Sequence, residues 1–149
     1  MAVDFQVVLD CADPHPLARF WAAALGYEVE DNSAMIDGLL ANGAVPEEMT
    51  VVYDGRREWA ALVALRHPDD PVDERTGAGK GRRMLLIAVP EAKSVKNRMH
   101  LDLKVGTANL GSEAARLESL GATVVARISE HGSEWITLAD PEGNEFDIA

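Results

Sequence analysis

Apolar and polar positions follow the same order twice along the chain. The first occurrence is a strand-like run at 5–10, a helix from about 15 to 25, Gly26, and a second strand-like run. The second occurrence is a strand at 100–105, a helix at 111–120, Gly121, and another strand. Each helix ends at a Gly, the residue that enters the left-handed conformation past a helix end without a steric penalty. The pattern predicts an internal duplication.

Further short strands complete each repeat. In the second repeat they are expected at 123–128, 135–138 and 145–148, the last one after the turn Asp140-Pro141-Glu142-Gly143-Asn144. In the first repeat they are expected at 59–65 and 84–89, separated by a hydrophilic loop at 67–83 that we expect to be mobile. The first repeat also contains an insertion at 33–50, in which a short helix is expected at 34–40. A linker at 90–97 connects the two repeats.

This order predicts one α+β domain over residues 1–149. It consists of two βαβββ modules, the first at about 1–97 and the second at about 98–149. Because the helices are amphipathic, each is expected to pack one face on a sheet. The expected result is a curved mixed sheet that forms a cup, with the helices on its outer face.

Strand alternation places polar side chains on one face of this sheet, because successive residues of a strand point to opposite faces. His100 and Asp102 share a face in the second repeat, and Gln6 and Asp10 hold the equivalent positions in the first. On the last strand, Glu145 and Asp147 alternate with apolar residues in the same way. We therefore expect one polar cup, with Trp135 and Trp59 as aromatic residues along its wall.

Composition and charge narrow the possible partners. The 149 residues include 14 Lys and Arg against 25 Asp and Glu, a net charge of −11 that is spread along the chain. This argues against nucleic acid and anionic membranes, which require clustered Lys and Arg. No apolar run approaches the roughly 20 residues of a membrane span, and no signal-peptide pattern is present, so we expect a cytoplasmic protein. The single cysteine, Cys11, permits no internal disulfide and is interpreted as a buried small hydrophobe.

Several stretches resemble the vicinal oxygen chelate superfamily, in its bacterial glyoxalase-like branch. They are residues 7–14, 17–21, 25–26, 89–91, 96–103 and 135–148. The resemblance implies two βαβββ modules, a cup that holds a divalent metal in many members, and a homodimer. The family's metal-ligand positions fall on Gln6, His100 and Glu145. A fourth position falls within 84–89, where this chain has no metal-binding side chain.

The expected ligands do not decide whether a metal is bound, or which metal it is. Imidazole and carboxylate suit Zn, Ni, Fe or Mn, whereas the amide oxygen of Gln6 is a weak, neutral ligand. The alternative is a metal-free pocket in which His100 and Glu145 bond to each other or to a neighbouring Arg. The remaining histidines, His15, His67 and His131, are interpreted as surface residues in turns or loops.

Two functions follow from these possibilities. The first is a metal-dependent lyase or isomerase of the glyoxalase type, in which a cation polarises two vicinal oxygens of a small substrate and Glu145 moves a proton. Asp10, Asp102, Trp135 and Asp147 would contact that substrate. The second is a metal-free protein that binds or sequesters a small molecule, as antibiotic-resistance members do. A third possibility, oxygen activation at iron, would need Gln6 in place of an expected histidine.

Overall fold

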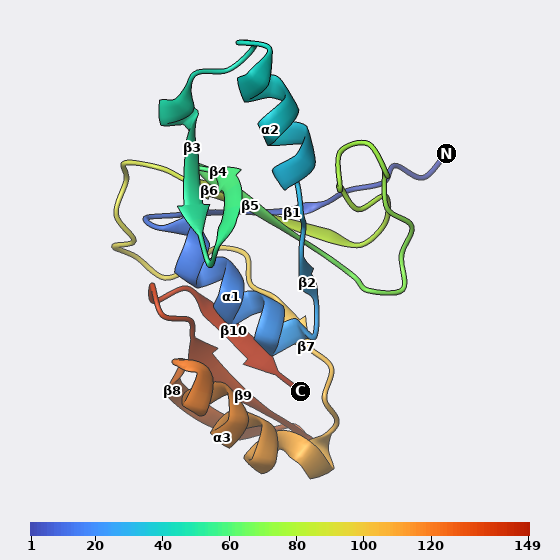
Figure 1. Ribbon diagram of the computed structural model, residues 1–149. Helices are drawn as coiled ribbons and strands as arrows, with labels where there is room; N and C mark the ends of the chain where they lie inside the picture. Colours follow the sequence, from blue (N-terminus) through green and yellow to red (C-terminus); the bar gives the residue numbers. More distant parts are fainter.

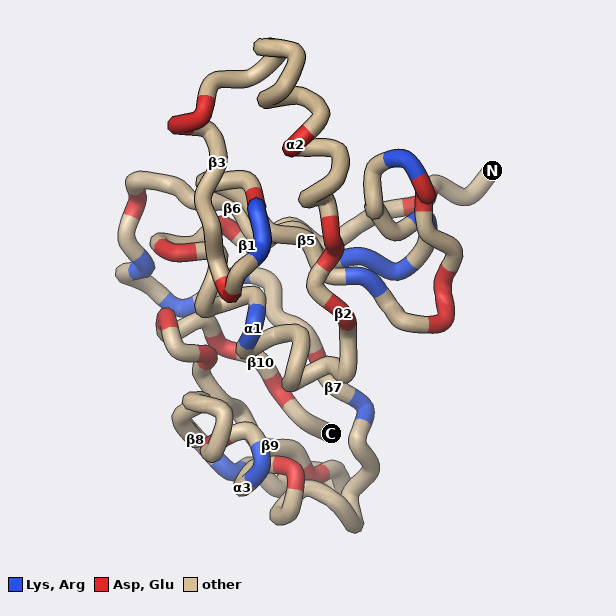
Figure 2. The backbone as a smooth tube through the Cα atoms, in the orientation of Figure 1, with Lys and Arg blue, Asp and Glu red and all other residues tan.

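The computed structural model describes residues 1–149. It contains two four-stranded sheets, each packed against a helix, and a separate two-stranded hairpin (Figure 1). None of its helices is both long enough and apolar enough to cross a membrane. Lys and Arg positions are scattered among Asp and Glu positions along the whole tube (Figure 2).

The first sheet has the strand order β1-β6-β5-β2, with β1 parallel to β6 and the other pairs antiparallel. Its strands are β1 (Val7–Cys11), β2 (Glu28–Val29), β5 (Leu62–Arg66) and β6 (Arg83–Ala88). Helix α1 (Pro14–Leu25) begins where the side chain of Asp13 accepts the backbone N–H of His15, and it ends at Gly26, whose φ is 68°. Its apolar stripe, which includes Leu17 and Ala24, is buried.

The second sheet has the order β7-β10-β9-β8 and the same hydrogen-bonding pattern, with β7 parallel to β10. Its strands are β7 (Asp102–Leu103), β8 (Thr123–Glu130), β9 (Ser133–Ala139) and β10 (Glu145–Ile148). Helix α3 (Leu110–Leu120), preceded by the 3-10 turn η2 (Thr107–Asn109), buries Leu110, Ala114 and Leu117. The two-module α+β fold expected from the sequence is confirmed.

One apolar core joins the two sheets. Trp21 of α1 packs edge-on against Phe146 of β10, with ring centroids 4.9 Å apart, and both side chains are buried. The indole N–H of Trp21 donates to Oδ2 of Asp140 at 3.0 Å. Asp140 also accepts the backbone N–H of Asn144 and so shapes the turn before β10. The core therefore fixes the start of β10 relative to the first sheet.

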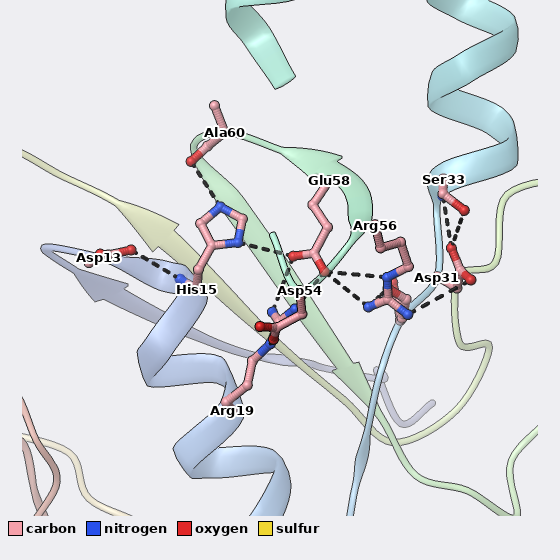
Figure 3. Close-up of polar contacts among 10 residues, drawn as sticks. Asp13, His15, Arg19, Asp31, Ser33, Asp54, Arg56, Glu58 and Ala60 are labelled. Atoms are coloured by element: carbon pink, nitrogen blue, oxygen red, sulfur yellow. Dashed lines mark hydrogen bonds and ion pairs between the residues drawn. The ribbon is translucent and has the colours of Figure 1, made fainter. Parts of the chain in front are cut away.

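The insertion in the first module forms a small unit of its own. It contains α2 (Ser33–Ala41), the 3-10 turn η1 (Glu47–Met49) and the hairpin β3 (Thr50–Tyr53) and β4 (Arg56–Trp59). A buried ionic cluster attaches this hairpin to α1 (Figure 3). Glu58, 6% exposed, accepts hydrogen bonds from Arg19 at 2.6 Å, from Arg56 at 3.0 Å and from His15 Nδ1 at 3.0 Å.

Two sequence interpretations are wrong, those of His15 and of Trp59. His15 is 5% exposed and lies within α1, with Nε2 3.3 Å from the carbonyl oxygen of Ala60, so it is not a surface histidine in a loop. Trp59 ends β4 and belongs to the hairpin, because the strand expected at 59–65 begins only at Leu62. The loop at 67–83 contains internal backbone hydrogen bonds, among them Asp73 to Ala78 and Lys80 to Pro71, and its mobility stays a prediction.

Candidate functional site

A pocket of about 280 Å³ opens at the seam between the two sheets. Gln6, His100 and Glu145 all line it, although they come from the segment before β1, the segment before β7 and the start of β10. The rest of the lining is mainly apolar, with Leu9, Trp21, Met84, Met99, Leu101 and Phe146 among the contributors. The fold thus brings the three expected ligand positions to one pocket, although Gln6 and His100 lie just outside the strands. Their role as metal ligands stays a prediction.

Gln6 is engaged by a cation of the protein itself. Its Oε1 accepts a hydrogen bond from Nη1 of Arg83 at 3.1 Å. Arg83 is in turn fixed by the buried carboxylate of Glu30, to which it donates from Nε at 2.6 Å and from Nη2 at 2.9 Å. The amide oxygen that would serve as the third ligand therefore already has a charged donor.

Glu145 is engaged in the same manner. Its Oε2 accepts the backbone N–H of Asn97 at 2.9 Å and lies 3.1 Å from Nζ of Lys93. The Asn97 N–H, with Lys93 adding to it, holds the pKa of Glu145 down to about 2. A carboxylate with so low a pKa is a weak proton acceptor near neutral pH, so this arrangement disfavours Glu145 as the general base.

His100 stands beside two carboxylates on the polar face of the second sheet. Its Nε2 lies 3.3 Å from Oδ1 of Asp102 and 3.4 Å from Oδ2 of Asp147. Asp102 and Asp147 are register partners in the parallel pair β7 and β10, which explains why they meet. One donor atom from each of the three residues lies within 4.8 Å of the others. The hydroxyl of Thr137 donates to Oδ1 of Asp147 at 2.6 Å and orients that carboxylate from β9.

These three side chains fit a divalent cation. Ligand atoms bound about 2 Å from one ion lie roughly 3 Å apart when they are adjacent, and the two distances from His100 to the carboxylates, 3.3 and 3.4 Å, are close to this value. An imidazole with two carboxylates is a donor set suited to Mn, Fe, Ni or Zn, and Thr137 supplies the kind of supporting hydrogen bond that orients metal ligands. The set shares His100 with the ligands expected from the sequence but replaces Gln6 and Glu145 with Asp102 and Asp147.

None of the four expected contact residues, Asp10, Asp102, Trp135 and Asp147, lines the seam pocket itself. Asp102 and Asp147 adjoin it through their contacts with His100. Asp10 borders a separate hollow with Cys11, Lys93 and Glu142, and Trp135, half-buried on β9, does not line the seam pocket. Cys11 is buried, as expected from the sequence. Burial raises the pKa of its thiol to about 12, with the charge of Glu142 adding to the effect.

The sequence from residue 6 to residue 149 matches the profile of the glyoxalase-like domain family. The chain belongs to this family. The resemblance to the vicinal oxygen chelate superfamily is thereby confirmed. No curated protein matches the chain in sequence.

Solved structures of the same fold include fosfomycin resistance proteins. FosX from Mesorhizobium loti aligns with a TM-score of 0.60 and 10% identity over 99% of this chain and 90% of its own. A mutant of FosX from Listeria monocytogenes, complexed with Mn(II) and 1S,2S-dihydroxypropylphosphonic acid, aligns with a TM-score of 0.63 and 9% identity. This alignment covers 99% of this chain and 91% of the FosX chain. A glyoxalase/bleomycin resistance protein/dioxygenase family enzyme from Burkholderia phytofirmans aligns with a TM-score of 0.57 and 15% identity. This alignment covers 96% of this chain and 94% of that enzyme's chain. Identities this low establish the shared fold alone.

Sequence reasoning missed the partners of the expected site residues. Arg83 and Lys93 meet Gln6 and Glu145 across 77 and 52 positions of the chain. Alternation along a strand says which face a residue points to, but not which distant side chain meets it there. Basic residues cluster in the sequence just before His100, and Lys93 is the member of this cluster that reaches the pocket wall.

Proposed function

We propose that this protein binds a small molecule in the seam pocket and uses a divalent cation held by His100, Asp102 and Asp147 to orient its oxygen atoms. The observation that carries this proposal is the position of His100, which lines the pocket and also lies within 3.4 Å of both carboxylates. The Mn(II) bound by the FosX relative supports it. The corresponding reaction class is a metal-assisted lyase or isomerase.

The residues around the pocket would have three different roles. Trp21, Met84 and Phe146 offer an apolar wall that would hold the body of the ligand and exclude water. His100, Asp102 and Asp147 would hold the cation, which when bound supplies a Lewis acid that polarises a ligand oxygen. Gln6 and Glu145, each with its cationic partner, would present polar groups that select the head group of the ligand.

A metal-free binding protein is the second candidate, and a specific observation favours it. Arg83 and Lys93 bring positive charge to Gln6 and Glu145, two of the positions where the family resemblance implies metal ligands. A protonated His100 between Asp102 and Asp147 would likewise satisfy both carboxylates without an ion. In this version the pocket sequesters its ligand and no reaction follows.

Manganese binding separates the two candidates. Protein freed of metal by dialysis is titrated with Mn²⁺ by calorimetry, together with His100→Ala, Asp147→Asn and the control Glu134→Gln, which removes an exposed carboxylate elsewhere on β9. We expect one site per chain, about tenfold or more weaker in the first two variants and unchanged in the control. No binding by the parent protein would refute the metal-dependent function and leave sequestration.

The pocket itself needs an independent test. Val8 lines it and is 48% exposed, so Val8→Trp should fill the pocket with little disturbance of the core. Val52→Trp, at a 59% exposed position of β3, is the matched control. A ligand at 100 times its Kd stabilises the folded state by about 2.7 kcal/mol. A thermal-shift screen should therefore find compounds that stabilise the parent and the control but not Val8→Trp; equal shifts in all three proteins would place binding elsewhere.

The homodimer implied by the family resemblance is also a proposal. Phe5 and Met99, 90% and 88% exposed, lie at the rim of the pocket, where a second copy would cover them. Light scattering of the purified protein tests this. A monomer at micromolar concentrations would contradict it.

A further inference from the structure

The segment that connects the two modules is attached to the rest of the protein in an unusual way. Between β6 and β7 the chain runs from Pro90 to Met99 without helix or strand. No residue of this segment takes part in a backbone–backbone hydrogen bond. Its hydrogen bonds to the body of the protein are those of Lys93 and Asn97, and both of these residues bond to Glu145.

The same segment forms part of the pocket wall. Asn97 and Met99 line the pocket next to His100, and Glu145 lines it from β10. Val95 and Met99 are 73% and 88% exposed, so apolar burial contributes little to holding the segment in place. Lys93 also donates from Nζ to the carbonyl oxygen of Val95, a contact within the segment itself.

We propose that residues 90–99 are a strap that controls access to the pocket and that the carboxylate of Glu145 fastens it. Glu145 is in this case a positioning residue: it determines where Asn97 and Met99 stand, and through them the shape of the pocket. The attachment of the strap is independent of any ligand. Its control of ligand access rests on the proposed function of the seam pocket.

The physical reason for a single fastening point lies in the strength of the contact. Hydrogen bonds to a charged group are about twice as strong as those between neutral groups, and here one carboxylate accepts a backbone N–H and an ammonium together. The start of β10 is rigid, because Asp140 and Trp21 fix the turn before it. A strap held at one rigid point by polar contacts opens locally without disturbing the core.

Limited proteolysis with trypsin tests the attachment, because Lys96 and Arg98 provide cleavage sites within the strap itself. In Glu145→Ala we expect cleavage at these two sites to accelerate about tenfold, the factor that corresponds to the loss of one charged hydrogen bond. Exchange of the Asn97 amide, followed by NMR, should accelerate by a similar factor. Both measurements use protein without ligand, so they remain valid if the proposed function fails.

Two further variants complete the comparison. Glu142→Ala removes a nearby carboxylate that accepts the backbone N–H groups of Ala12 and Asp13 at 2.8 Å and does not bond to the strap, so it should leave strap cleavage unchanged. Lys93→Met keeps the Asn97 contact and should give an intermediate rate. If Glu145→Ala does not fold, Lys93→Met alone tests the attachment. The proposed attachment would be overturned if Glu145→Ala and Lys93→Met were both cleaved at the parent's rate. It would also be overturned if Glu142→Ala accelerated cleavage as much as Glu145→Ala does.

Dye association tests the control of access. The amphipathic, anionic dye 1-anilinonaphthalene-8-sulfonate is mixed with each protein in a stopped-flow instrument, with Val8→Trp identifying the signal that comes from the pocket. Glu142→Ala removes one negative charge, as Glu145→Ala does, and so controls for the charge of the dye. A released strap should speed dye association in Glu145→Ala severalfold and leave it unchanged in Glu142→Ala. Faster cleavage with an unchanged association rate would refute gating, although the attachment would stand.

Discussion

Replacement of Glu58 by alanine tests whether the buried ionic cluster holds the inserted hairpin in place. The side chain of Glu58 is 7% exposed and accepts hydrogen bonds from three residues, at distances between 2.6 and 3.3 Å. Its removal leaves the guanidinium groups of Arg19 and Arg56 close together without their shared counter-charge. These side chains keep 26% and 29% exposure, so water solvates them in part.

The expected loss follows from these numbers. Removal of one partner from a buried ion pair costs about 3–5 kcal/mol, because the remaining charge is left without compensation. Partial solvation of the two arginines, and their remaining ion pairs with Asp54 and Asp31, place this case at the lower end, at about 3 kcal/mol. For a domain of this size, such a loss lowers Tm by roughly 10 °C.

Urea denaturation followed by circular dichroism measures the difference. The control is Glu28→Ala, which removes the carboxylate of the pair with Arg66, where Glu28 is 53% exposed and the expected loss is below about 1 kcal/mol. If the two variants lose the same small free energy of unfolding, the cluster does not stabilise the fold. An unchanged urea slope in Glu58→Ala would show that the loss arises in the folded state.

Three further outcomes are expected from other parts of the molecule. Gly77→Ala should destabilise the protein by more than about 2 kcal/mol in urea denaturation, because its φ is 75° and an added Cβ would lie 1.9 Å from the carbonyl oxygen of Asp31; Gly43→Ala, also at positive φ but in open space, should cost only about 1 kcal/mol. Cys11 should resist iodoacetamide at pH 8 until the protein unfolds, and rapid labelling of folded protein would contradict its burial. Burial alone would raise the pKa of Glu58, but hydrogen bonds and charge from Arg19 and Arg56 lower it. The contribution of Glu58 to the free energy of unfolding should therefore be complete above about pH 4.5 and decline at lower pH. The free energy of unfolding of Glu58→Ala should accordingly fall less steeply with decreasing pH than that of the parent protein.

The sequence predicts the main elements of the fold because their signals are local. Helix α1 and the turn before β10 depend on spacing, a capping residue and turn residues that are close together in the chain, and both appear where expected. The hairpin of β3 and β4 is absent from the expected elements although the sequence carries its signal. Asp54 and Gly55 join the strands with φ of 49° and 75°, and Asp-Gly is typical of such turns. The strand that follows, Arg56–Trp59, is mainly charged, so the apolar pattern does not mark it.

The ionic cluster could not have been predicted in the same way. His15, Arg19 and Glu58 are separated by up to 43 positions, and each alone is typical of a surface residue. They meet because the inserted hairpin folds back over α1, a feature of tertiary structure that hydrophobic periodicity does not describe. The pocket was partly predictable because the duplicated order of elements places Gln6 and His100 at equivalent positions, just before β1 and β7, and Glu145 at the start of β10.

The distribution of charge around the pocket bears on which residues would receive a cation. At Glu145 the negative charge already faces Lys93, and the oxygen of Gln6 already faces Arg83. Asp102 and Asp147 bring two negative charges to His100, and the nearest lysine, Lys104, lies 3.7 Å from Asp102. The proposed cation site therefore lies where two carboxylates face a single lysine, whereas at Glu145 one carboxylate faces one lysine. A ligand with a polar head at the cation site would extend its apolar part toward the buried side of the seam.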